Sequence, residues 1–120
     1  MGTRRVVTLV IIALSARAFV ACAPARARLP VATEAGVWFT LVAPEAQRVA
    51  VAGSFNQWST TAHPLTRGRR AGEWTTVVAL PPGEFSFMFV VDGARWLTPP
   101  AAEQYVDDGF GTKNGIVSVR

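Results

Sequence analysis

One alternating segment, residues 84–91, constrains the fold of this chain more than any other. Phe85, Phe87 and Phe89 fall on one side of the alternation, and Met88 and Val90 fall on the other. Because successive side chains of a β-strand point to opposite faces, this period of two predicts a strand with an aromatic core face. The turn residues 81–83 precede it and the hairpin signal 92–93 follows it. The chain is therefore expected to be built around a central antiparallel strand.

Further strands are predicted on both sides of this segment. Apolar or alternating stretches separated by turn residues lie at 36–43, 48–52, 73–80, 95–97 and 115–119. No convincing 3.6-residue periodicity follows residue 30, and 120 residues suffice for one domain only. We predict an all-β protein, an immunoglobulin-like β-sandwich of six to eight short strands.

Residues 1–21 have the pattern of a secretory signal. Arg4 and Arg5 precede an apolar run over residues 6–14, well short of the roughly 20 residues that span a bilayer. Two endings compete, because residues 16–18 fit a small-x-small cleavage site while residues 19–22 resemble a bacterial lipobox in which Cys22 would be acylated. An uncleaved anchor is a third alternative. We expect an exported protein, either periplasmic or a membrane-anchored lipoprotein.

Residues 22–34, rich in Ala, Pro and Arg, are predicted to be a flexible tether before a domain over residues 35–120. The formal net charge of +4 belongs mostly to the leader, since the chain from Cys22 onward holds nine basic and eight acidic side chains. A small basic cluster, Arg67, Arg69 and Arg70, lies in a predicted loop. It is too narrow for a nucleic-acid footprint, so we expect no nucleic-acid partner, and contact with a membrane only through the possible lipid anchor.

Residues suited to catalysis or metal binding are scarce. The single cysteine excludes an internal disulfide and a cysteine-rich metal site, and His63 has no partner that the sequence suggests. Asp92 fits a hairpin turn, and Asp107 and Asp108 fit a solvated loop, better than the facing carboxylates of a glycosidase. We predict no enzyme, no cofactor and no metal.

The segment Gly53-Ser54-Phe55-Asn56-Gln57-Trp58-Ser59 resembles the glycogen-binding modules of AMP-activated protein kinase β subunits and the N-terminal modules of starch-branching and debranching enzymes, carbohydrate-binding module family 48. Further matching motifs follow in order over residues 36–119: Pro64-Leu65, Leu80-Pro81-Pro82-Gly83, Val91-Asp92-Gly93 with Trp96, and Gly111-Thr112-Lys113-Asn114. The resemblance implies the same sandwich fold and a non-catalytic module for α-1,4-linked glucan such as glycogen, starch or maltooligosaccharide.

The family's glucan-facing positions correspond to Trp58, Met88, Trp96, Thr112 and Asn114. Sugar binding in water relies on aromatic faces beneath the pyranose ring, because each hydroxyl hydrogen bond gains only about 1 kcal/mol. Met88 stands where the kinase modules have a lysine, so a charged donor is lost, although a thioether can pack against a ring. The other two tryptophans, Trp38 and Trp74, lie within predicted strands and are expected to be structural.

Two classes of function stay open from the sequence. The first is the glucan-binding module, whose partner besides the polysaccharide could be an envelope protein or a glucan-active enzyme. The second is an envelope protein-interaction domain of the same fold with a vestigial sugar site. Exposure of Trp58 and Trp96 on one face would favour the first, and their burial would favour the second.

Overall fold

The computed structural model describes residues 2 and 26–120. The predicted cleavage sites and the proposed lipidation at Cys22 lie outside the described residues. Within the described part of the chain, no helix has the length and apolar character needed to cross a membrane.

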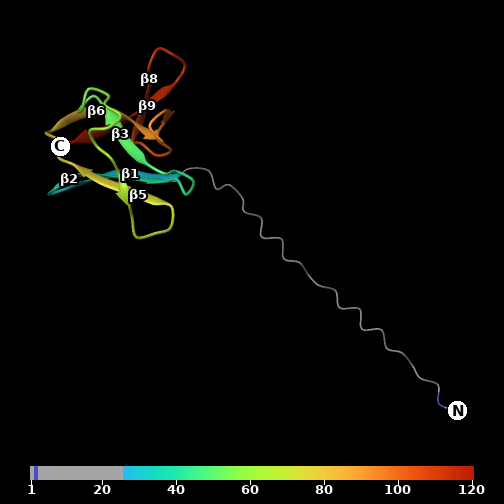
Figure 1. Cartoon of the computed structure of the whole chain (residues 1–120). Helices are drawn as coiled ribbons and strands as arrows, with labels where there is room; N and C mark the ends of the chain where they lie inside the picture. Colours follow the sequence, from blue (N-terminus) through green and yellow to red (C-terminus); the bar gives the residue numbers. More distant parts are fainter. Residues whose placement is uncertain (1, 3–25) are drawn as a thin grey trace.

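Residues 26–120 form an all-β sandwich of two antiparallel sheets, which confirms the predicted fold class (Figure 1). Sheet A has the strand order β1-β2-β5-β4, and sheet B has the order β3-β6-β9-β8 with β7 beside β6. The strands are β1 (Arg26–Thr33), β2 (Gly36–Val42), β3 (Val49–Gly53), β4 (Thr66–Arg67), β5 (Glu73–Val78), β6 (Gly83–Val91), β7 (Arg95–Leu97), β8 (Gln104–Asp107) and β9 (Lys113–Val119).

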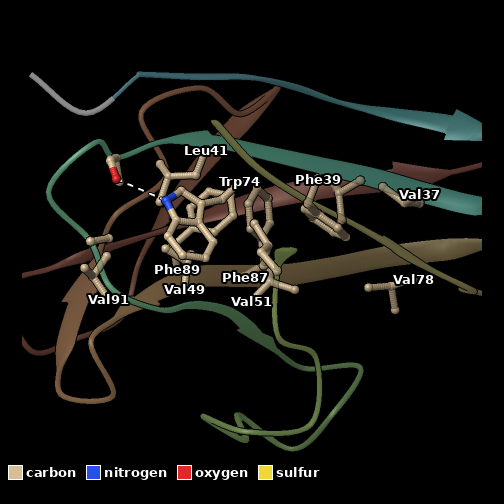
Figure 2. Packing of buried hydrophobic residues seen from close by; sticks show 14 residues of the cluster. Val37, Phe39, Leu41, Val49, Val51, Trp74, Val78, Phe87, Phe89 and Val91 are labelled. Carbon is tan, nitrogen blue, oxygen red and sulfur yellow. Dashed lines mark hydrogen bonds between the residues drawn. The ribbon is translucent and has the colours of Figure 1, made fainter. Parts of the chain in front are cut away.

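The core lies between the two sheets, where β2 and β5 of sheet A face β3 and β6 of sheet B (Figure 2). Phe39 of β2 packs edge-on against Phe87 of β6, with ring centroids 5.1 Å apart. Phe87 and Phe89 are buried in this core, so the alternation predicted for residues 84–91 is confirmed. The same alternation turns Met88 to the outer face of sheet B.

Strand β1 corrects the prediction that residues 22–34 form a tether. It pairs with β2 from Arg26 opposite Val42 to Thr33 opposite Gly36, with a register shift between Arg28 and Val31. The stretch has few apolar side chains to bury, but β2 would otherwise present a row of unpaired backbone groups at the sheet edge. Backbone pairing therefore places the start of the sandwich at Arg26 rather than Ala35.

Two further expectations differ from the structure. Residues 104–107, expected within a loop, form β8 and pair with β9. Trp38, expected to be structural, lies on the outer face of sheet A with 44% of its surface exposed, because its neighbours Val37 and Phe39 occupy the core face. Trp74, by contrast, is buried, and its Nε1 donates a hydrogen bond to the Ala43 carbonyl at 3.1 Å.

Candidate functional site

A single hollow of about 580 Å³ on the outer side of sheet B contains every sugar-facing residue expected from the family resemblance. These residues come from the loop after β3, from β6 and β7, from the segment that leads into β9, and from β9 itself. Two further residues complete the lining. The full set is Trp58, Met88, Trp96, Asp108, Phe110, Thr112 and Asn114.

The loop that carries Trp58 is closed by the side chain of Asn56. Its Oδ1 accepts hydrogen bonds from the backbone N–H groups of Gly53 at 3.0 Å and Ser59 at 3.2 Å. Its Nδ2 donates to the Val51 carbonyl at 3.0 Å and lies 2.9 Å from Nδ1 of His63. His63 therefore has a partner that the sequence did not suggest, Asn56, and the two side chains together help to close the loop.

Trp58 is held in an unusual backbone conformation. Gln57 and Trp58 have φ values of 58° and 59°, in the left-handed region that non-glycine residues seldom adopt. The Trp58 N–H donates to the Gly53 carbonyl at 2.9 Å, and the half-buried indole packs on Ala50, Ala52 and Val90. The loop thus fixes the indole against the outer face of sheet B, while Phe55 turns toward the core.

Trp96 is positioned by the hairpin that joins β6 to β7, where it lies opposite Val90. Asp92 occupies the turn with a φ of 54°, and its Oδ1 accepts hydrogen bonds from the N–H groups of Gln47 at 2.8 Å and Arg48 at 3.1 Å. These two hydrogen bonds lower the pKa of Asp92 below its ordinary value, and the one from Gln47 has the larger effect. The carboxylate therefore ties the hairpin turn to residues 47 and 48. On this hairpin the Trp96 side chain is 44% exposed.

The two indoles lie on the same side of the domain. Their ring centroids are 6.5 Å apart and their planes are inclined by 50°. Met88 shares their hollow and is only 6% exposed, so its thioether contributes to the floor rather than to the rim. The arrangement offers two aromatic surfaces at an angle with an apolar floor.

A loop stabilised by Asp108 forms the remaining wall. The sequence predicted a loop here but did not place it at the sugar site. Asp108 Oδ1 accepts hydrogen bonds from the N–H groups of Phe110 at 2.7 Å and Thr112 at 3.2 Å, and Oδ2 accepts one from the Thr112 hydroxyl. The Thr112 hydroxyl is the largest cause of a lowered pKa for Asp108. Asp108 is thus a structural acceptor, and the spacing Asp-x-Phe-x-Thr was the signal that could have identified it.

Phe110 is the second residue of the hollow that sequence reasoning missed. It stands at the tip of the same loop between Gly109 and Gly111, whose φ values are 83° and 90°. Its side chain is 91% exposed, far more than an apolar side chain of this size usually is. The hollow therefore holds a third aromatic group, together with the polar side chains of Thr112 and Asn114.

Within the described residues, no group of three or more His, Cys, Asp or Glu side chains could hold an ion. The donors and acceptors at the hollow are an amide, a hydroxyl and a carboxylate beside aromatic rings. Such a surface is suited to binding a polar ligand with apolar ring faces.

Known proteins resemble this chain over most of the sandwich. The sequence profile described as "Glycogen recognition site of AMP-activated protein kinase" matches residues 39–120. The 5'-AMP-activated protein kinase subunit beta-1 of Sus scrofa is 38% identical over 74 residues, which are 62% of this chain and 56% of that protein. The Homo sapiens subunit beta-1 is also 38% identical over 74 residues, but these cover 25% of its length.

A bacterial enzyme is similar over part of the same region. The 1,4-alpha-glucan branching enzyme GlgB of Pseudomonas syringae pv. syringae is 40% identical over 65 residues, which are 53% of this chain and 9% of the enzyme. The matched stretch thus spans about half of the porcine subunit and a small part of the enzyme. The chain belongs to the family of the glycogen recognition site of AMP-activated protein kinase, as its motifs predicted.

Proposed function

We propose that this chain is a non-catalytic module that binds α-1,4-linked glucan by stacking glucose rings on Trp58 and Trp96. The observation that carries the proposal is that both indoles, with Met88, Thr112 and Asn114, line one open hollow. Stacking on an aromatic face removes the apolar side of a pyranose ring from water. This burial supplies binding free energy that hydrogen bonds to the ring hydroxyls alone do not supply. Glycogen, starch and maltooligosaccharides share this linkage and are the expected ligands.

The polar groups would orient the sugar. The Asn114 amide can both donate to and accept from ring hydroxyls. Thr112 already donates its hydroxyl hydrogen to Asp108, so its oxygen is left as an acceptor for a sugar hydroxyl. Phe110, at the exposed loop tip, would add a third apolar contact at the mouth of the hollow.

Binding is expected to be weak. The hollow is open to solvent and lacks a charged donor at the Met88 position, so a dissociation constant in the range of hundreds of micromolar is expected, corresponding to about 5 kcal/mol. We also propose that the module is exported, either as a lipoprotein acylated at Cys22 or as a soluble protein. The apolar run at residues 6–14 supports export.

Electrophoresis through glycogen-containing gel tests the sugar site. The natural chain should be retarded relative to a gel without glycogen, and Trp96→Ala should remove most of the retardation. Trp38→Ala is the matched control, because Trp38 is equally exposed at 44% but lies on sheet A. If the natural chain is not retarded, the hollow does not bind glucan. The same conclusion follows if Trp96→Ala is retarded as much as the natural chain and the Trp38→Ala control.

A further inference from the structure

A second hollow, of about 680 Å³, lies on the outer side of sheet A, away from the glucan-binding hollow. Four arginines line it: Arg28 from β1, Arg67 from β4, and Arg69 and Arg70 from the loop that follows. Glu73 is the one acidic side chain among its lining residues. The proposed glucan site uses none of these residues.

The floor of this second hollow is a tryptophan beside hydroxyl side chains. Trp38 lies on the outer face of β2, and Thr40, two residues on, shares that face. The strand register places Arg28 opposite Thr40 and Thr40 opposite Thr75. An exposed indole, two hydroxyls and a guanidinium are thereby brought together from three neighbouring strands.

One of the four arginines, Arg67, has its guanidinium group on the core side of sheet A. The Arg67 guanidinium carbon lies 4.5 Å from the centroid of the buried Trp74 ring, a cation–π arrangement. The Trp74 ring is itself fixed by its hydrogen bond to the Ala43 carbonyl. Arg67 is the strand partner of Trp74, so its charge lies on the core side of the sheet edge. The guanidinium groups available to the outer hollow are therefore those of Arg28, Arg69 and Arg70.

Positive charge is concentrated at this hollow and not spread over the domain. Residues 26–120 carry nine basic and eight acidic side chains, so the sandwich as a whole is close to neutral. Three of those nine basic groups, those of Arg28, Arg69 and Arg70, line this one hollow. A nearly neutral domain with one cationic depression favours a compact anionic ligand over a long polyanion that tracks a broad basic surface.

We propose that the sheet A hollow binds an anionic saccharide, a sugar ring that carries a carboxylate or a phosphate. Trp38 would lie against the apolar face of the ring, and Thr40 and Thr75 would face its rim. Guanidinium groups pair with carboxylates and phosphates through two parallel hydrogen bonds, so the arginines would hold the anionic group. A single indole provides one ring platform, whereas a single-stranded nucleic acid needs successive aromatic platforms for its bases.

Isothermal titration of the full chain tests this site with three soluble probes. Trigalacturonate offers carboxylates on sugar rings, glucose 6-phosphate offers a phosphate on one ring, and inorganic phosphate offers the anion alone. At least one anionic sugar should bind more tightly than inorganic phosphate, and its binding should weaken as salt rises. The first two probes distinguish the two sources of negative charge.

Variants test whether the anionic sugar binds in the sheet A hollow and whether positive charge there favours its binding. Arg69→Gln combined with Arg70→Gln should weaken binding by about tenfold or more, and Trp38→Ala should also weaken it. Glu73→Gln should tighten binding by about threefold, because it removes the opposing charge. Trp58→Ala and Arg95→Gln, which change sheet B, should leave it unaltered.

Several results would overturn the proposal. They are equal affinity for inorganic phosphate and for the sugars, tighter binding of single-stranded DNA than of either sugar, or no binding of either anionic sugar. An unchanged affinity in the double arginine variant would also overturn it. Because the glycogen-gel result depends on Trp96 and this titration depends on Trp38, failure of one site leaves the other intact.

Discussion

The indole of Trp58 and the indole of Trp96 meet with centroids 6.5 Å apart and planes inclined by 50°. Both are positioned around Val90, since Trp58 packs on it and Trp96 lies opposite it across the β6–β7 pair. Two platforms at such an angle cannot both lie flat against a straight chain of sugar rings. They can each contact a ring of a curved chain, and an α-1,4 linkage curves its glucan.

This angle leads to a prediction about linkage. Maltoheptaose should bind about two- to tenfold more tightly than cellohexaose, whose β-1,4 linkage keeps the chain straight, because the straight chain loses one of two stacking contacts worth about 0.5–1.5 kcal/mol each. Titration of both oligosaccharides measures the ratio. Equal affinities would mean that only one indole contacts the ligand.

A second prediction concerns the side chain that closes the Trp58 loop. Asn56→Ala removes the acceptor for the Gly53 and Ser59 N–H groups and the donor to the Val51 carbonyl. Leaving part-buried groups without partners should lower the free energy of unfolding by about 1–3 kcal/mol and weaken glucan binding, because Trp58 loses its fixed position. Urea unfolding and maltoheptaose titration measure the two effects.

The control for this prediction is Asn56→Asp. It keeps an oxygen acceptor for Gly53 and Ser59 but loses the amide donor to Val51, so its stability should lie between those of the natural chain and Asn56→Ala. If Asn56→Ala binds glucan as tightly as the natural chain, then the loop does not position Trp58.

The third prediction uses the lowered pKa of Asp92. A carboxyl group whose pKa is lower in the folded state stabilises the fold above its unfolded pKa, and this contribution is lost as the pH falls through the folded value. In Asp92→Asn the oxygen acceptor remains and the charge is gone. The natural chain should therefore be more stable than Asp92→Asn at about pH 6, and the difference should shrink by about pH 3.

Thermal unfolding across that pH range measures the difference. Asp107→Asn, which removes the same charge from β8, controls for the change in net charge. If the difference in stability between the natural chain and Asp92→Asn stays constant from neutral to acid pH, then the Asp92 charge does not stabilise the hairpin.

The central part of this fold was predictable because its signals are local. The aromatic alternation before Asp92 and Gly93 specifies β6 and its hairpin, and the Gly53–Ser59 motif specifies the loop that carries Trp58. Strands β1 and β8 were not predicted, because both lie at sheet edges and gain most of their stability from backbone pairing. Backbone pairing leaves little trace in the side-chain pattern.

The site was predicted through motifs and completed by the structure. The hollow unites Trp58, Trp96 and Met88 as the family resemblance implied, while their role in sugar binding stays a prediction. Asp108 and Phe110 were not predicted at the site, because their position there depends on a short loop closed by side-chain to backbone hydrogen bonds. An exposed Trp38 was missed because an apolar strand alone does not indicate which of its faces is covered.

The fourth prediction concerns Cys22 and is independent of the sandwich. If Cys22 is acylated, the natural protein should fractionate with membranes, and Cys22→Ser should release it or block its maturation. Expression in a bacterial host followed by membrane fractionation and mass spectrometry of the N-terminus measures this. A soluble exported form that begins at Phe19 would instead establish cleavage at the small-x-small site.

The last prediction uses the departure from the family at Met88. This residue lies on the floor of the hollow and its side chain faces away from Phe87 and Phe89, so Met88→Lys should leave the aromatic core intact. A lysine has the length to extend its ammonium group out of the floor while its stem replaces the thioether. It would gain Asp108 as an acidic neighbour along the same hollow.

Met88→Lys should therefore fold and bind maltooligosaccharides more tightly than the natural chain. A hydrogen bond from a charged donor contributes about 1.5–3 kcal/mol, of which competition with water removes a large part, so a gain of a few-fold up to about tenfold is expected. Met88→Leu is the control, because it keeps an apolar floor and adds no donor. Calorimetric titration with maltoheptaose compares the three proteins: equal affinity of Met88→Lys and Met88→Leu would mean that this position does not face the sugar.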